Sequence, residues 1–328
     1  MKQIGGSIST PRSIVIGMLV VGIVVASVGG SAATASPTAT RLVTGLAGGS
    51  GSTVGPDRAL YVTEGAAGRV SRVDPETGDV TTYATGLPPS IIGIGGAMDV
   101  EFFGGSAYVL VTLVGQDVGG SDVVGIYRID GPDEFTIIAD IGAWAMTHPP
   151  STDFVVPTGV QYAMQGFRNG FLVTDGHHNR VLWVTLAGAI TEIIEFGNIV
   201  ATGLEVRGDT VFIAQAGPAP HLPEDGKIVA LRMRSGAVAE IAAGGRLLVD
   251  VELGRGKRLV ALAQGEFTPG NPEGSPANPN TGELLGADGL GGFIVLEGGL
   301  NQPTSLELIG NVAFVVTLGG EIWRIDIA

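Results

Sequence analysis

The sequence contains no cysteine. Disulfide bonds, zinc–thiolate sites and cysteine nucleophiles are therefore excluded. Charged residues make up only 15% of the chain, and basic ones are the scarcer kind, with 18 Lys and Arg against 32 Asp and Glu. The net charge of −14 argues against nucleic acid as a partner, because phosphate contacts require a basic surface.

Glycine and hydrophobic residues are abundant instead, with 54 Gly and 45% hydrophobic residues. A chain this apolar can bury a core and is not intrinsically disordered. The glycines follow no strict third-residue period, which excludes collagen. No segment beyond the N-terminal region shows a long 3.6-residue periodicity, so we expect almost no helix.

The N-terminal residues have the pattern of a secretory signal peptide. Lys2 and Arg12 accompany an apolar run at 14–28, and small residues follow, ending in an A-x-A site at 33–35. The run is shorter than the ~20 residues of a membrane-spanning helix, although an uncleaved anchor helix is the alternative. We expect residues 1–35 to be removed and the protein to be secreted, either periplasmic or extracellular.

The mature chain, residues 36–328, repeats a pattern of short apolar strands and is expected to contain no transmembrane span. One strand recurs as LYVTEG, AYVLVT, GFLVTD, TVFIAQ, RLVALAQ and AFVVTL, at 60–65, 107–112, 170–175, 210–215, 258–264 and 313–318. Four strands per repeat of about 50 residues, with glycine-rich turns, are typical of a propeller blade. The sequence therefore predicts an all-β, six-bladed β-propeller, since one small sheet cannot bury both of its faces.

The two ends of the chain predict how the ring closes. The sixth repeat ends after its third strand, at 321–326, and a strand-like segment, 40–46, precedes the first repeat. We expect this N-terminal strand to complete the last blade, because closure removes two free sheet edges. The alternative is that residues 40–46 are a leader without a partner.

Several stretches resemble known propeller families. GPDRALYVTE (55–64) and DGHHNRVLWV (175–184) are similar to NHL-type repeats. More closely, GPDRALYVTEG, VVGIYRID (123–130) and GFLVTDGHHNRVL (170–182) resemble the ScyD/ScyE family of exported propellers, over about residues 40–326. The resemblance implies the fold and an exported location. It consists of blade-forming positions, so it implies no catalytic residue.

In a propeller, the loops between the second and third strands of each blade share one face with the blade-to-blade connections. We call this the loop face and expect a ligand there, around the central channel. The candidate ligand-binding residues are Glu64, Asp99, Asp175, His177, Gln215, His221, Asp250 and Gln264. The carboxylates among them, Glu64, Asp99, Asp175 and Asp250, are candidates for binding Ca²⁺ or another divalent cation. The alternative is that they are solvated turn residues that bond their own backbone.

The four histidines and three long loops also fall on this predicted face. His148, His177, His178 and His221 all lie in loop-face connections, where imidazole can shuttle protons or bind a metal. Their spacing matches no metal motif, and a structural role is the alternative. The segments 140–157, 216–226 and 264–281 are longer than turns require and can form a rim around the channel, although 264–281 can equally be a flap.

These patterns favour a propeller that binds a small molecule, a glycan or another exported protein at its loop face. The alternative is an enzyme that uses the acidic and histidine residues of this face, either a metal-dependent lactonase-type hydrolase or a lyase. The first would resemble gluconolactonase-type propellers, in which a channel metal polarises a lactone. There is no G-x-S-x-G motif, which argues against a serine hydrolase. Convergence of the four carboxylates would favour the enzyme, and carboxylates turned into loops would favour binding.

Overall fold

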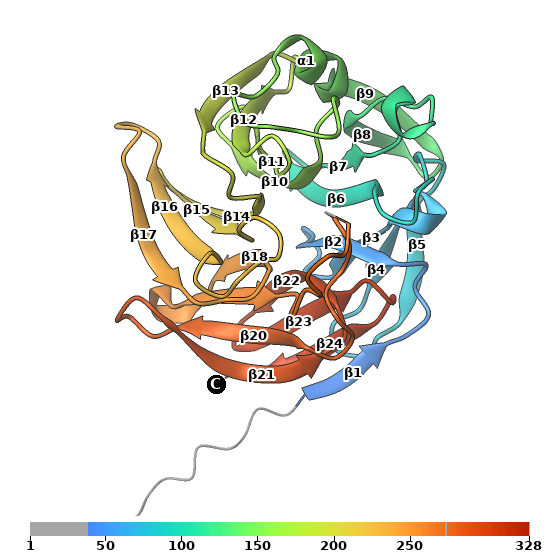
Figure 1. Ribbon diagram of the computed structural model, residues 1–328. Helices are drawn as coiled ribbons and strands as arrows, with labels where there is room; N and C mark the ends of the chain where they lie inside the picture. The colour runs from blue at the N-terminus through green and yellow to red at the C-terminus, as the bar shows by residue number, and fades with distance from the viewer. Residues whose placement is uncertain (1–38, 273, 328) are drawn as a thin grey trace, which may run out of the picture. The chain divides into compact units, whose positions relative to one another are not determined.

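The computed structural model describes residues 39–272 and 274–327. They form six four-stranded antiparallel sheets arranged as the blades of a β-propeller (Figure 1), as the repeats predict. The predicted signal peptide, residues 1–35, lies outside the described residues. Within the described part of the chain, no helix is long and apolar enough to cross a membrane.

Each blade is a meander of consecutive strands, and the short connections explain why neighbours in sequence pair in space. Blades 1 to 3 are formed by β2 (Gly49–Val54), β3 (Leu60–Glu64), β4 (Arg69–Val73) and β5 (Val80–Ala84); β6 (Gly96–Phe103), β7 (Ser106–Thr112), β8 (Gly125–Gly131) and β9 (Glu134–Asp140); and β10 (Gln161–Phe167), β11 (Gly170–Asp175), β12 (Arg180–Thr185) and β13 (Ile190–Glu195).

The other three blades follow the same plan, except that the last one takes a strand from the start of the chain. They are formed by β14 (Ala201–Arg207), β15 (Thr210–Gln215), β16 (Lys227–Arg232) and β17 (Val238–Ala243); β18 (Leu248–Leu253), β19 (Leu259–Ala263), β20 (Gly282–Ala287) and β21 (Phe293–Leu300); and β22 (Pro303–Ile309), β23 (Val312–Thr317), β24 (Ile322–Asp326) and β1 (Ala39–Val43).

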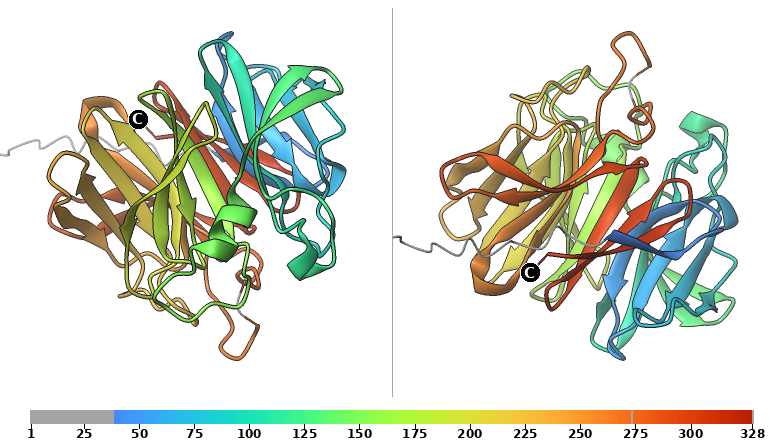
Figure 2. Two further views of the ribbon diagram at one scale, coloured as in Figure 1. Left: turned by 90° about the horizontal axis from the view of Figure 1, so that it is seen from above. Right: turned by 90° about the horizontal axis from the view of Figure 1, so that it is seen from below.

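The described residues contain little helix, as expected. One α-helix, α1 (Ile141–Thr147), lies in the long connection between blades 2 and 3, and Asp140 caps it by accepting a hydrogen bond from the Ala143 amide. Three short 3₁₀ turns complete the helical content: η1 (Gly65–Ala67), η2 (Gln116–Val118) and η3 (Arg255–Lys257). Figure 2 shows α1 and the loop 264–281 projecting from the same face of the ring, which is the predicted loop face.

The hydrophobic core lies between blades rather than within them. The inner strands β2, β6, β10, β14, β18 and β22 face the middle of the ring in Figure 1. One buried cluster joins Val70 and Ala84 of blade 1 to Val109 and Val111 of blade 2, and the other clusters also join neighbouring blades. A blade can therefore bury its apolar faces only when both neighbours are present.

The N-terminal strand closes the ring, as predicted, although it spans β1 rather than residues 40–46. It pairs antiparallel with β24, with Arg41 opposite Trp323. The Arg41 guanidinium also lies 5.0 Å from the centre of the Trp323 ring. Val43 is buried with Leu60 of blade 1 and Phe314 of blade 6, so β1 also seals the junction between the first and last blades.

We expect removal of β1 to destabilise the whole propeller. A chain that begins at Thr44 loses several backbone hydrogen bonds at about 0.5–1.5 kcal/mol each and the burial of Val43 at about 1.5–3 kcal/mol. Thermal unfolding of this chain, compared with one that begins at Pro37 and keeps β1, measures the loss. Equal melting temperatures for the two monomeric proteins would contradict closure by β1.

Candidate functional site

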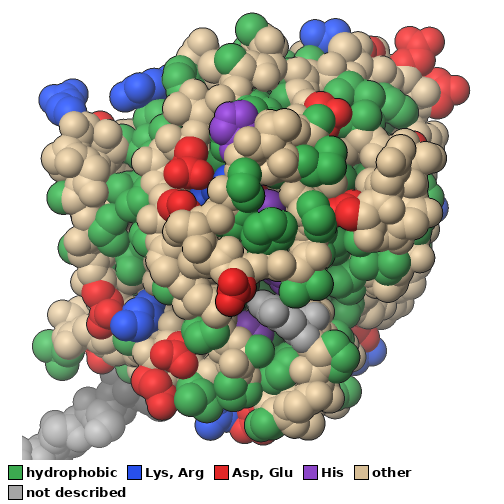
Figure 3. Space-filling model, turned by 45° about the horizontal axis from the view of Figure 1, so that its top comes forward, with side chains coloured by type: hydrophobic (Ala, Val, Ile, Leu, Met, Phe, Trp, Pro, Cys, Tyr) green, Lys and Arg blue, Asp and Glu red, His purple; other side chains and the backbone are tan. Residues whose placement is uncertain are grey.

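A pocket of about 470 Å³ opens at the loop face, on the axis of the ring. The starts of all six inner strands contribute to its wall, and aliphatic side chains dominate it; they include Ile94, Leu113, Val160, Val200, Leu247 and Val249. Among the described residues, no Asp, Glu, Lys or Arg lines this loop-face pocket. Figure 3 shows histidine side chains among apolar ones near the middle of this face.

Three of the predicted binding residues line the loop-face pocket: His177, His221 and Gln264. They follow the second strands of blades 3, 4 and 5, so the connections between the second and third strands of three adjacent blades supply them. His221 packs edge-on against Phe267, with ring centres 5.1 Å apart. Gln264 is nearly buried and accepts a hydrogen bond of 2.9 Å from the Ala277 amide.

These contacts decide between the two interpretations of the loop 264–281. Phe267 and Ala277 are buried, with 8% and 1% of their surfaces exposed. Gln302 also donates a hydrogen bond to the Ala277 carbonyl. The described residues of the loop thus form a rim of the pocket.

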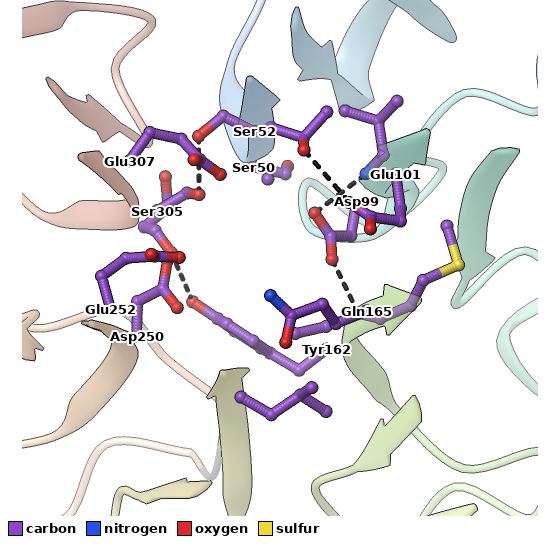
Figure 4. A pocket seen from close by; sticks show the side chains of 17 residues that line it. Ser50, Ser52, Asp99, Glu101, Tyr162, Gln165, Asp250, Glu252, Ser305 and Glu307 are labelled. Atoms are coloured by element: carbon purple, nitrogen blue, oxygen red, sulfur yellow. Dashed lines mark hydrogen bonds between the residues drawn. The ribbon is translucent and has the colours of Figure 1, made fainter. Parts of the chain in front are cut away.

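A second cavity, of about 110 Å³, lies further along the channel. Residues later in all six inner strands line it, and five of them are carboxylates, Asp99, Glu101, Asp250, Glu252 and Glu307. Figure 4 shows these side chains facing one another across the space. We call it the acidic cavity. Of the residues that the structure describes, three line both this cavity and the loop-face pocket: Ser50, Tyr162 and Thr304.

Tyr162 lies at the boundary between the two cavities. It extends from β10 in blade 3, and its hydroxyl donates a hydrogen bond of 3.1 Å to the Thr304 carbonyl of β22 in blade 6. Blades 3 and 6 are opposite one another in a six-bladed ring, so this side chain crosses the channel (Figure 4). Burial, with the nearby carboxylates of Asp250 and Asp99, raises the pKa of Tyr162 well above its ordinary value.

The channel carboxylates are held in an environment that favours their protonated forms. Burial raises the pKa of Asp250 to about 7. Burial also raises the pKa values of Asp99, Glu252 and Glu307 well above the usual range, and neighbouring carboxylates add to the shift. Glu101 shows a smaller rise in pKa, also caused mainly by burial.

Asp99 and Asp250 lie in the channel wall rather than at the loop-face mouth, which corrects the prediction. Each follows a bulge in its inner strand. Asp99 accepts a 2.7 Å hydrogen bond from the Met164 amide, and Asp250 accepts one of 2.7 Å from the Leu306 amide, in each case from the next blade. These two carboxylates therefore connect adjacent blades.

Glycine in the preceding blade leaves room for each of these aspartates. A Cβ atom on Gly51 would lie 2.3 Å from Asp99 Oδ1, and one on Gly203 would lie 2.3 Å from Asp250 Oδ1. A larger residue at either glycine would displace the aspartate carboxylate from the backbone amide that donates a hydrogen bond to it. The same arrangement thus occurs twice, in blades 1 to 3 and in blades 4 to 6.

Glu64 and Asp175 are engaged by arginines at the starts of the following strands. Glu64 accepts hydrogen bonds of 2.7 and 2.6 Å from Arg69, and Asp175 accepts one of 3.2 Å from Arg180. Both carboxylates are fully buried, so they are not solvated turn residues either. The four predicted metal ligands do not converge, and no group of three His, Asp or Glu residues in the described ranges could hold a metal.

The two remaining histidines and Gln215 do not line the loop-face pocket. His178 Nδ1 accepts a hydrogen bond of 2.8 Å from Arg180, and the His148 carbonyl accepts one of 2.7 Å from the same guanidinium. All four histidines lie on the loop face, as predicted. His148 and His178, however, contact Arg180 of blade 3 and not the pocket. Gln215 is buried at the end of β15.

Sequence reasoning missed Arg180 and Tyr162. An acid followed five residues later by arginine recurs as Glu64–Arg69 and Asp175–Arg180, and this spacing could have revealed the paired arginines. No signal marks Tyr162, because its importance depends on the blade opposite.

No protein-family model matches the sequence, and no curated protein matches it. Solved propeller structures are similar in fold. Virginiamycin B lyase from Staphylococcus aureus is 13% identical over 89% of this chain and 99% of that one, with a TM-score of 0.55. A gluconolactonase from Xanthomonas campestris is 12% identical over 88% of this chain and 89% of that one, with a TM-score of 0.62.

A PQQ-bound aldose sugar dehydrogenase from Streptomyces coelicolor is 14% identical over 89% of this chain and 98% of that one, with a TM-score of 0.56. At these identities the similarity shows the propeller fold alone. Proteins named as a lyase, a lactonase and a dehydrogenase share it, so the fold does not select a function.

We expect Arg180→Met to lower the free energy of unfolding by about 3–5 kcal/mol, because it leaves the Asp175 carboxylate buried without its partner. The matched control is Arg128→Met, which breaks the solvent-screened pair with Asp130 and should cost far less. Urea unfolding of both variants measures the difference. Similar losses in the two would contradict the role of Arg180.

We also expect stability to depend on the channel carboxylates. A carboxyl group whose pKa is higher in the folded state stabilises the fold when protonated, and this contribution is lost as pH rises. The free energy of unfolding should therefore fall between about pH 4, the unfolded pKa of these groups, and the value of about 7 for Asp250. Burial alone would raise the pKa of Glu64, but its hydrogen bonds, led by that of Arg69, lower it. The stability that Glu64 contributes is therefore lost as the pH falls below the ordinary pKa of glutamate.

The double variant Glu252→Gln/Glu307→Gln tests this directly. Within the described residues, neither side chain accepts a hydrogen bond or forms an ion pair, so the change removes charge with little else. Melting temperature should rise at pH 8 and stay unchanged at pH 4. The exposed pair Glu76→Gln/Glu134→Gln should show neither effect. An equal shift at both pH values would count against the electrostatic cause.

Proposed function

We propose that the protein binds an uncharged, largely apolar small molecule in the loop-face pocket. The observation that carries this proposal is the lack of charged side chains among the described residues that line it, in a chain of net charge −14. A buried charge on a ligand would have no partner there, which is costly. Pockets of this size with a mainly apolar wall are typical small-molecule sites.

The polar side chains support recognition along one edge of the ligand. His177, His221 and Gln264 come from adjacent blades, whereas Ile94 and Leu113 line the part of the wall formed around blade 2. Apolar contact would supply most of the affinity, and the imidazole and amide groups would orient the molecule. A glycan, which needs many hydrogen-bonding groups, fits this wall less well than a compact apolar compound.

Export and family are part of the proposal. The signal-peptide pattern of residues 1–35 supports secretion, and the blade-forming stretches that resemble ScyD/ScyE proteins support an exported propeller of that type. Edman sequencing of protein from an expressing culture would find an N-terminus near Ser36 under this proposal and Met1 otherwise.

A lyase is the second candidate, because His177 and His221 both line the loop-face pocket. Imidazoles can take and return a proton on a bound molecule. Mass spectrometry distinguishes the two functions: a binding protein returns its ligand unchanged, and a lyase returns products. The metal-dependent lactonase finds no support in the predicted carboxylates, because protein groups engage all four.

Two fluorescent probes that share one aromatic skeleton test the proposal. N-phenyl-1-naphthylamine is uncharged, and 8-anilino-1-naphthalenesulfonate carries a sulfonate. We expect the uncharged probe to bind at least about tenfold more tightly, a difference of about 1.4 kcal/mol, because no lysine or arginine among the described lining residues meets the sulfonate. Equal binding of both probes would count against the proposed ligand class.

A pair of tryptophan variants locates the bound probe. Met98→Trp fills part of the loop-face pocket and should weaken binding of the uncharged probe at least about tenfold. Leu290→Trp adds the same side chain at a residue that is 94% exposed, in the turn between β20 and β21, and should leave binding unchanged. Unchanged binding in Met98→Trp would place the probe elsewhere.

A further inference from the structure

We propose that Tyr162 determines the specificity of the loop-face pocket, by separating it from the acidic cavity and so excluding amphiphiles that carry an amine. This inference rests on the proposed function, since it concerns ligands of the same pocket. It assigns the exclusion of amines to one side chain.

The geometry places Tyr162 where the two cavities meet. The order along each inner strand shows that they lie on one axis: Val249 lines the loop-face pocket, and Glu252, three residues later, lines the acidic cavity. On β22, Thr304 lines both cavities, and Glu307, three residues later, lines the acidic cavity alone. At the boundary, the Tyr162 ring spans the channel and is tied to the opposite blade through Thr304.

The kind of side chain that lines the channel changes at Tyr162. Five carboxylates line the acidic cavity, and neither a lysine nor an arginine in the described ranges lines it. On the loop-face side, no described lining residue carries a charge. A molecule confined above Tyr162 therefore meets only aliphatic groups and neutral polar groups.

This arrangement predicts what happens when Tyr162 is removed. An amphiphile with an apolar tail and an ammonium head loses hydration of its charge in the wild-type pocket and gains no partner. Without the phenol ring, the ammonium can extend past the boundary and meet Asp250 or Asp99, which lie close enough to influence Tyr162. An alcohol with the same tail gains no such interaction.

Decan-1-ol and decylammonium, which differ only in the head group, test the inference by isothermal titration calorimetry at about pH 8, where the amine is charged. We expect wild type to bind the alcohol at least about tenfold more tightly than the amine. Tyr162→Ala should lose this preference or reverse it. Tyr162→Phe retains the ring and should keep the wild-type preference.

Further variants identify the cause. Asp250→Asn added to Tyr162→Ala should reduce the gained amine binding, because Asp250 is one of the carboxylates that the ammonium meets past the boundary. Tyr127→Phe, which also removes a hydroxyl that donates to a backbone carbonyl, is the control for stability, because Tyr127 does not line either cavity. Melting temperatures confirm that each variant is folded.

The outcomes are distinguishable. A folded Tyr162→Ala protein that keeps the wild-type preference overturns the role of Tyr162 but leaves the proposed function intact. If wild type binds neither compound, the proposed function fails. In that case, amine binding gained by Tyr162→Ala still supports the separation of the cavities, and its absence overturns it.

Discussion

The propeller depends on carboxylates that connect one blade to the next inside the ring. Asp99 and Asp250 each accept a hydrogen bond from an inner-strand amide of the following blade, and Gly51 and Gly203 leave the space that this requires. A carboxylate reaches an amide at this distance only when the two blades keep a constant separation. These contacts hold blade 2 to blade 3 and blade 5 to blade 6 beside the acidic cavity.

The same channel carries an electrostatic cost. Burial raises the pKa of its carboxylates, and their closeness to one another raises it further, as for Glu252 and Glu307. The structure confines these carboxylates to one part of the axis. Tyr162, bonded across the channel to Thr304, separates it from an apolar pocket at the loop face. Two chemically different spaces therefore adjoin within one ring of similar blades.

The fold itself leaves the chemistry open, since proteins named as a lyase, a gluconolactonase and a sugar dehydrogenase share it at 12–14% identity. The composition of the loop-face pocket is more selective. Its aliphatic wall, with His177, His221 and Gln264 on adjacent blades, is the basis for the proposed compact uncharged ligand.

The sequence by itself determined the six blades, the closing strand and the side of the ring on which His177, His221 and Gln264 lie, because strand patterns and turn positions are local. The prediction that four carboxylates bind a ligand or cation did not foresee their protein partners. Glu64, Asp99, Asp175 and Asp250 accept hydrogen bonds from Arg69, Met164, Arg180 and Leu306, respectively. The partners Arg69 and Arg180 follow their acids at a local spacing, but only the tertiary structure decided the partners of Asp99 and Asp250 and the position of Tyr162. The physical reason is that a channel brings together residues from different blades, far apart in sequence, and no local pattern encodes which of them meet.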